Sequence, residues 1–352
     1  MRPVLRVLVA FCFASVAAFA AAQQSKVPRI GYLAAVSVEA DTPRLQAFRQ
    51  GLRELGYVEG RDLVIDYRHE DRSLDRLPTL AAELVATKPD VLVGVTTNAA
   101  IAVKKAAGAL PVVFMGVTDP VNAGLVASLA NPGGNATGVT NMAAILTGKR
   151  LEYLKSTFPG VKRIAVLWDP KAPGSVPQWE ESKEHAKPLG LTLYSMEVSS
   201  NDQYEGAFAR AVAAQNGAVW VTLNPLANSN QLRIAELAAK HRLPSVCARS
   251  DYADNGCLMS YGPGYSIEGR DAARYVDKIL KGAKPASLPV EQPTKFEFVV
   301  NQKTANRLGI AVTPAILLQA YRIIECSAVR VTAAIGDRPA TRYLSLRHRC
   351  AG

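Results

Sequence analysis

Short apolar runs alternate with amphipathic stretches over most of the chain. The runs are continuous rather than strictly alternating, which is typical of parallel strands covered by helices on both faces. In the first half of the chain they predict strands at 30–34, 63–67, 91–95, 112–117 and 138–141. In the second half they predict strands at 164–168, 191–198, 218–223 and 245–248.

Apolar residues at helical spacing fill the intervals between these strands. Thr42 and Pro43 are expected to begin the first helix, and Asn98 is expected to cap the third. Further helices are expected near 149–158, 177–188, 202–214 and 228–241. Because strands and helices alternate, the pattern indicates βαβ units and parallel sheets. Two such sets, joined near residues 142–148, predict an α/β protein with two doubly wound lobes.

The segments after residue 257 exceed what the second sheet requires. The pattern predicts a strand at 258–262, a helix at 265–280, a proline-bearing connector at 281–293, a strand at 295–300 and a helix at 302–308. Chain that crosses back between two lobes would use such elements.

The first 22 residues have the pattern of a secretory signal peptide. Arg2 and Arg6 precede sixteen uncharged residues that end in the small residues before Gln23. A membrane anchor is the alternative, but the stretch is shorter than the roughly 20 residues that a spanning helix needs. We expect an exported product that is cleaved near Ala22.

The formal net charge of +11 is unevenly distributed. The first 22 residues contribute +2, and the last 27 contribute +4 through five arginines and one aspartate. The remaining charge is ordinary for about 300 residues, so a nucleic-acid partner is not expected. Cys247 and Cys257 could form a disulfide after export, or Cys247 could remain a buried thiol.

The chain lacks the motifs of the common enzyme classes. No P-loop, dinucleotide-binding glycine motif or nucleophile elbow occurs, and the four histidines have no ligand at metal-binding spacing. An NTPase, a dehydrogenase, a hydrolase or a zinc enzyme is therefore not expected, and neither is a cofactor.

Polar and aromatic residues instead follow the predicted strands, at the edge where doubly wound sheets bind ligands. The candidate binding residues in the first half are Val36, Ser37, Thr96, Thr97, Asn98, Thr118, Asp119 and Asn141. Those in the second half are Trp168, Asp169, Asn224, Pro225, Ser250, Asp251 and Tyr261.

Each of these positions also has a purely structural explanation. Ser, Thr and Asn are common helix caps, and the aromatic residues could fill the interface between the lobes. If they bind a ligand, Thr97, Asn98 and Thr118 would hold a carboxylate at a helix start. Asn224 and Asp251 would contact an amine, and Trp168 or Tyr261 would cover the side chain.

Four segments resemble the periplasmic ABC-transporter substrate-binding family of the type I fold, near its tryptophan-, tyrosine- and phenylalanine-binding members. They are FRQGLRELGY (48–57), Asp119-Pro120 with NPGGNATG (131–138), YVDKILKGAKP (275–285) and LPVEQPTKF (288–296). The resemblance covers about residues 27–325. It implies two Rossmann-like lobes joined by three crossovers near 142–146, 260–264 and 288–294.

By this resemblance, residues 27–142 with 263–289 form the first lobe, and residues 143–262 with 290–325 form the second. The implied function is capture of a small metabolite, with aromatic or branched amino acids leading, by hinge closure between the lobes. A monomeric periplasmic protein would deliver it to an ABC permease in the inner membrane.

Two other functions and one departure accompany this interpretation. The same cleft could serve a sensing module for a membrane receptor or kinase, or an enzyme that uses Asp119, Asp169 and Asp251. The family chain usually stops near Glu325, whereas here an arginine-rich stretch follows at 326–352. We predict that this tail is disordered; contact with membrane lipid is the alternative.

Overall fold

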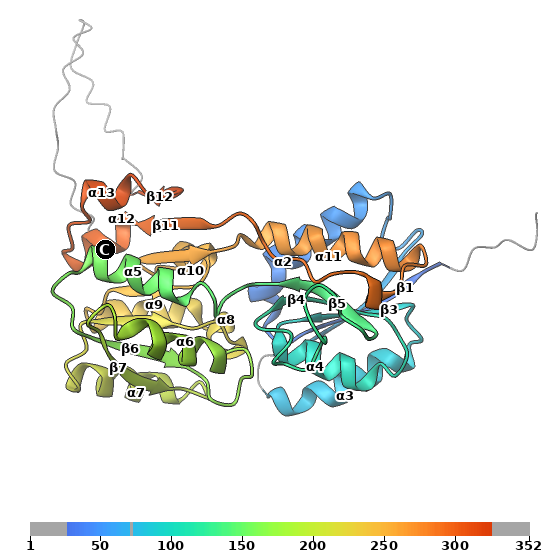
Figure 1. Cartoon of the computed structure of the whole chain (residues 1–352), viewed down its shortest axis with the longest axis horizontal. Helices are drawn as coiled ribbons and strands as arrows, with labels where there is room; N and C mark the ends of the chain where they lie inside the picture. The colour runs from blue at the N-terminus through green and yellow to red at the C-terminus, as the bar shows by residue number, and fades with distance from the viewer. Residues whose placement is uncertain (1–26, 71–72, 326–352) are drawn as a thin grey trace, which may run out of the picture.

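The computed structural model describes residues 27–70 and 73–325, which form two α/β lobes side by side (Figure 1). The predicted signal peptide and the predicted tail at 326–352 lie outside the described residues. Within them, no helix combines the length and apolar character needed to cross a membrane. The predicted two-lobed α/β fold is confirmed.

The first lobe contains a parallel five-stranded sheet in the order β2-β1-β3-β4-β5. Its strands are β1 (Arg29–Ala34), β2 (Val64–His69), β3 (Val91–Val95), β4 (Val112–Val117) and β5 (Ala136–Thr140). Its helices are α2 (Val38–Glu54), α3 (Leu77–Ala86), α4 (Thr97–Ala106) and α11 (Tyr265–Leu280), with the 3₁₀ turns η1 (Leu74–Arg76) and η2 (Pro285–Ser287). One apolar core packs beneath α2 and α11, and another beneath α3 and α4.

The second lobe contains a seven-stranded sheet in the order β12-β11-β10-β9-β8-β6-β7. Its strands are β6 (Arg163–Trp168), β7 (Thr192–Glu197), β8 (Ala218–Val221), β9 (Ser245–Cys247), β10 (Met259–Gly262), β11 (Glu297–Asn301) and β12 (Arg322–Ile324). Its helices are α5 (Thr147–Thr157), α6 (Val176–Ala186), α7 (Gln203–Ala213), α8 (Pro225–Ser229), α9 (Gln231–Lys240), α10 (Ser250–Asp254), α12 (Gln302–Leu308) and α13 (Pro314–Leu317). The sheet is parallel except where β11 runs antiparallel to β10.

Two helix starts differ from the prediction. α2 begins one turn before Thr42, because the Ser37 side chain accepts a hydrogen bond from the Ala40 N–H and caps the helix there. Pro43 consequently lies inside the helix. α4 begins at Thr97, so Asn98 is in the first turn rather than at the cap. The short elements α8, α10, α13 and β12 were not predicted, since three to five residues carry no readable period.

The chain crosses between the two sheets three times, after β5, after β10 and after η2. The second crossing places α11 against α2, although the two helices are more than 200 residues apart in sequence (Figure 1). Close approach requires small residues here, since a Cβ at Gly51 would lie 2.8 Å from the Ala273 Cβ. The first lobe is therefore completed by a helix from the last third of the chain.

Arg150 joins the first two crossings. Its guanidinium donates hydrogen bonds to the carbonyls of Ala143 (2.5 Å) and Tyr261 (2.7 Å), which flank those crossings. Burial lowers the pKa of Arg150 to about 9, so the group remains charged at neutral pH.

A disulfide joins Cys247 at the end of β9 to Cys257 before β10. Of the two possibilities that the sequence leaves open, the structure therefore has the bridge. The bridge encloses α10, which carries Ser250 and Asp251.

Candidate ligand-binding site

Three of the predicted first-lobe residues form one hydrogen-bonded chain across the ends of β3, β4 and β5. The Thr118 N–H donates to Thr97 Oγ1 at 3.1 Å, and the Thr118 hydroxyl donates to Asn141 Oδ1 at 3.1 Å. All three residues are buried. The ends of these strands are therefore held in one fixed arrangement.

The same strand ends carry unusual backbone conformations. Thr96, Asp119 and Met142 follow β3, β4 and β5 with φ angles of 78°, 47° and 51°. The other non-glycine residues with positive φ in the described part of the chain lie just beyond helix ends, where this conformation is common; they are Lys88, Gln215 and Arg242. A β-branched residue such as Thr96 rarely adopts positive φ, and such strain is concentrated at functional sites.

The two lobes touch at this edge. Gly174, in the loop between β6 and α6, lies against Thr97 and Thr118. On the other side of the interface, the Ser37 N–H donates to Ser229 Oγ at 3.0 Å. The contact at Gly174 covers the Thr97 hydroxyl, which already accepts the bond from Thr118.

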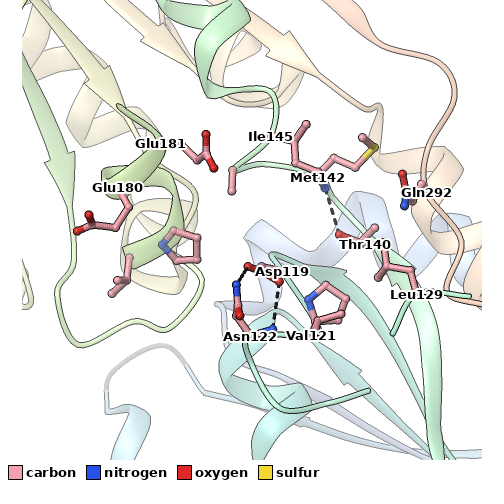
Figure 2. A pocket seen from close by; sticks show the side chains of 14 residues that line it. Asp119, Val121, Asn122, Leu129, Thr140, Met142, Ile145, Glu180, Glu181 and Gln292 are labelled. Atoms are coloured by element: carbon pink, nitrogen blue, oxygen red, sulfur yellow. Dashed lines mark hydrogen bonds between the residues drawn. The ribbon is translucent and has the colours of Figure 1, made fainter. Parts of the chain in front are cut away.

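The larger cavity between the lobes measures about 450 Å³. Its walls are mainly apolar and come from both lobes and from two crossings, as Figure 2 shows. They comprise Pro120, Val121, Leu129, Met142, Ala144, Ile145, Val176 and Pro177. The acidic side chains of Asp119, Glu180 and Glu181 lie on it as well.

A smaller cavity of about 260 Å³ lies where α2 faces α8 and α10. Ser37 and Asp251, two predicted site residues, line it from opposite lobes. The Asp251 carboxylate already accepts hydrogen bonds from Arg249 Nε at 2.7 Å and from Gln231. Asp251 is thus neutralised within its own lobe.

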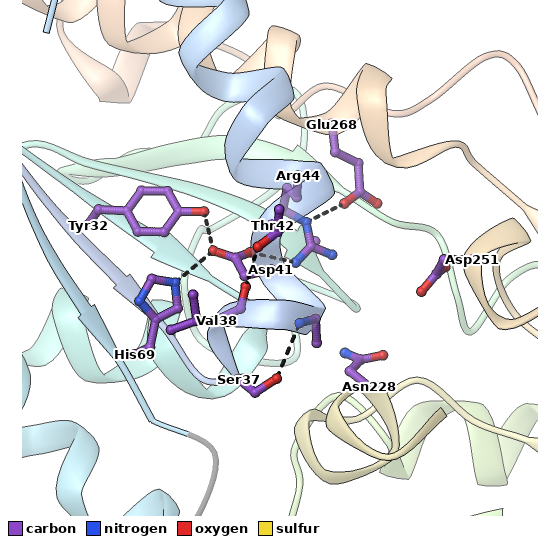
Figure 3. Close-up of polar contacts among 12 residues, drawn as sticks. Tyr32, Ser37, Val38, Asp41, Thr42, Arg44, His69, Asn228, Asp251 and Glu268 are labelled. Atoms are coloured by element: carbon purple, nitrogen blue, oxygen red, sulfur yellow. Dashed lines mark hydrogen bonds and ion pairs between the residues drawn. The ribbon is translucent and has the colours of Figure 1, made fainter. Parts of the chain in front are cut away.

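A buried charged cluster lies in the first lobe beside this cavity (Figure 3). The Asp41 carboxylate accepts from the Tyr32 hydroxyl at 2.8 Å and pairs with Arg44, whose Nε lies 3.2 Å from a Glu268 oxygen. Asp41, Arg44 and Glu268 are at most 1% exposed. His69 also contacts Asp41, at 3.1 Å. Burial and then the Asp41 charge raise the pKa of Tyr32 well above its usual value, so its hydroxyl stays a donor.

Four buried polar atoms near the facing edges of the lobes have no hydrogen-bond partner among the described residues. They are Thr96 Oγ1, Asn98 Oδ1, Asn224 Nδ2 and Glu268 Oε1. Thr96 and Asn98 follow β3, Asn224 follows β8, and Glu268 lies in the first turn of α11, directly after a crossing. Buried polar groups are nearly always paired, so these atoms are available for hydrogen bonds to a bound molecule or to water.

The other predicted residues are engaged within their own lobe. Trp168 stacks on Trp179 at 5.3 Å and donates its indole N–H to Ser195. Asp169 accepts from the Lys171 N–H and the Ser199 hydroxyl. Val36 lies in the first-lobe core after β1, and Tyr261 lies beside Tyr153 at the second crossing. Pro225 is the first residue of α8, and Ser250 is the first residue of α10.

Glu268, Gly174 and Met142 were missed in the sequence. Glu268 lies on an amphipathic helix that reads as ordinary core packing, and Gly174 stands in a turn-like Pro-Gly-Ser segment. Their importance depends on contacts between segments far apart in the chain. The available signal was the position of Glu268 just after a predicted crossing.

Comparison with known proteins places the whole described chain beside solute-binding proteins. The model of the family described as "ABC transporter substrate binding protein" matches residues 29–324. A tyrosine-binding protein of Clostridioides difficile is 26% identical over 265 residues, covering 75% of this chain and 76% of that protein.

Two solved structures are also similar to this chain. The ABC domain from Streptococcus pneumonia in complex with L-Trp is 29% identical, with a TM-score of 0.80, covering 85% of this chain and 100% of that one. A conserved domain protein from Vibrio cholerae is 30% identical, with a TM-score of 0.81 and the same coverage.

Proposed function

The chain belongs to the ABC transporter substrate-binding family, and on that premise we propose that it captures an aromatic amino acid between its lobes. Branched apolar amino acids are the next candidates. The protein is a solute-binding protein and not an enzyme. After export to the periplasm, it would act as a monomer and deliver its ligand to an ABC permease in the inner membrane.

Two observations carry this proposal: both lobes contribute unpartnered polar atoms at their facing edges, and a cavity with mainly apolar walls lies between the same lobes. An amino acid has a polar end that would satisfy the former and a side chain that would fill the latter. The tyrosine-binding relative and the tryptophan complex support an aromatic side chain.

The ligand carboxylate would lie at the start of α4, near Thr96, Thr97 and Asn98, where N–H groups of the first turn have no partner within the helix. Thr118 and Asn141 hold this edge in place. The amine would lie between Asn224 of the second lobe and Glu268 of the first. Glu268 replaces Asp251 in this role, because the Asp251 oxygens already bind Arg249 and Gln231.

The moving bodies would be residues 27–142 with 263–289, and residues 143–262 with 290–325. The three crossings between the sheets support two bodies, but Val290 and Glu291 hydrogen-bond to Leu129 and Gly138 of the first lobe, so the last boundary falls after residue 291. A ligand that contacts both bodies stabilises the closed form by its differential affinity for that form, and the permease would recognise the closed protein.

Thermal unfolding of the processed protein with each amino acid tests the proposal. Tryptophan, tyrosine or phenylalanine should raise the melting temperature most, because a ligand at 100 times its Kd adds about 2.7 kcal/mol to the unfolding free energy. Lysine and aspartate serve as controls. A shift caused only by charged amino acids, or by none, would refute an aromatic ligand.

A further inference from the structure

We infer that the two lobes contact each other at Gly174 when they close, and that closure requires a residue without a side chain at this position. This inference rests on the proposed function, since it concerns how the same cleft closes. It assigns to the loop between β6 and α6 a role beyond connecting two elements.

With the lobes arranged as in this structure, the space beside Gly174 cannot hold a side chain. A Cβ built on this glycine would lie 2.7 Å from Thr97 Oγ1 and 3.3 Å from Thr97 Cβ. Thr118 Oγ1 would be 3.4 Å away. Because both threonines belong to the first lobe, the clash is between lobes rather than within one.

The backbone at Gly174 does not itself require glycine. Its φ angle is outside the positive range that characterises Gly133 and Gly190. An L-residue could therefore adopt this conformation, and only the opposing lobe prevents it.

Neither partner can easily move aside. The Gly174 carbonyl accepts from Gln178 Nε2 at 2.6 Å, and the same amide binds the Leu223 carbonyl and N–H. The next residue, Ser175, bonds the Asp169 N–H. Across the interface, Thr97 Oγ1 is fixed by the Thr118 N–H. A side chain at 174 would therefore separate the lobes rather than displace its own loop.

The matched variants are Gly174→Val and Gly160→Val. Gly160 lies in the same lobe, has no atom within 4 Å of a built Cβ and has no positive φ. Small-angle scattering of the full processed chain with and without L-tryptophan measures closure, and calorimetry measures affinity. Wild type and Gly160→Val should contract and bind alike, whereas Gly174→Val should stay expanded and bind at least tenfold more weakly.

A cysteine pair tests the contact without any ligand. In Thr97→Cys/Gly174→Cys the Cβ atoms would be 3.3 Å apart without movement, and a slight separation of the lobes would bring them into the roughly 3.5–4.5 Å range typical of a disulfide. Mild oxidation should join the peptides that contain residues 97 and 174, as peptide mapping would show. The control pair Thr97→Cys/Gly160→Cys should remain unlinked.

The binding and cross-linking experiments together distinguish failure of the proposed function from failure of the proposed role of Gly174. A cross-link at 97–174 together with no binding of any amino acid would refute the proposed function and leave the Gly174 contact standing. Tryptophan binding with no cross-link, and with Gly174→Val contracting like wild type, would overturn the role of Gly174. A lower melting temperature of unliganded Gly174→Val than of Gly160→Val would also overturn it, since the damage would then lie within one lobe.

Discussion

Two carboxyl groups, those of Asp41 and Glu268, are buried in the first lobe with one guanidinium, that of Arg44. Asp41 and Glu268 share Arg44, and one Glu268 oxygen has no partner in the described chain. An unbalanced buried carboxylate is costly, and an ammonium group of a ligand would balance it. The charges of single residues thus favour a ligand with an amine.

Glu268→Gln should weaken binding of tryptophan by roughly tenfold or more, because a charge-assisted hydrogen bond is worth about 1.5–3 kcal/mol. It should change the affinity for indole-3-propionate, which lacks the amine, much less. Calorimetry with both compounds measures the difference. Asp277→Asn is the control on the same helix, since Asp277 binds Tyr57 and Lys281 instead. Equal losses for both compounds would show that Glu268 only holds the lobe together.

The sequence predicts residues at strand ends because parallel strands place their carboxyl ends at one edge. Thr97, Thr118 and Asn141 do meet there. Glu268 could not be predicted in the same way, because its neighbours come from α2 and β4, far away in sequence. Its unpartnered oxygen is a property of three-dimensional packing alone.

At the scale of elements, long periodic segments are predictable and short ones are not. The eleven predicted strands lie close to β1–β11, because continuous apolar runs require burial on both faces. The predicted start of α2 was wrong because Pro43 was interpreted as a first-turn proline. The Ser37 cap determines where the helix begins. The ten-residue interval between Cys247 and Cys257 permits a bridge but does not require one.

The bridge should stabilise the segment that carries α10. In Cys247→Ser/Cys257→Ser, we expect the urea midpoint to fall by an amount equivalent to about 2–4 kcal/mol, chiefly because the unfolded chain regains conformational freedom. Wild type unfolded under reducing conditions is the matched comparison. An unchanged midpoint would mean that packing of α10 against its neighbours suffices.

At the scale of the molecule, the sequence predicts two lobes and the crossings between them, because the elements after residue 257 are more than the second sheet needs. The relative position of the lobes does not follow, since it depends on contacts such as that between Gly174 and Thr97. The role of Arg150, which donates hydrogen bonds at two crossings, could not be predicted from the sequence either. Such contacts join residues far apart in the chain, and no sequence pattern predicts which of them meet.

A chain that stops after Glu325 should keep the melting temperature and ligand affinity of the processed protein, because residues 326–352 show no pattern for burying surface. A chain that stops after Gln319 is the control. It lacks β12, which pairs with β11, and the Tyr321 N–H that donates to the Phe298 carbonyl. Differential scanning calorimetry should detect a loss only in the shorter chain. A loss in both would refute the prediction for the tail.

The packing of α11 on α2 also governs the order in which the chain can acquire its structure during synthesis. The first 142 residues contain all five strands of the first sheet, but one face of that sheet is covered by α2 alone until residues 265–280 have been made. The second sheet likewise waits for β11 and β12. Neither lobe can therefore acquire all of its elements until the last third of the chain has been synthesised. For the export that we propose, such a delay would favour passage of the chain in an unfolded state.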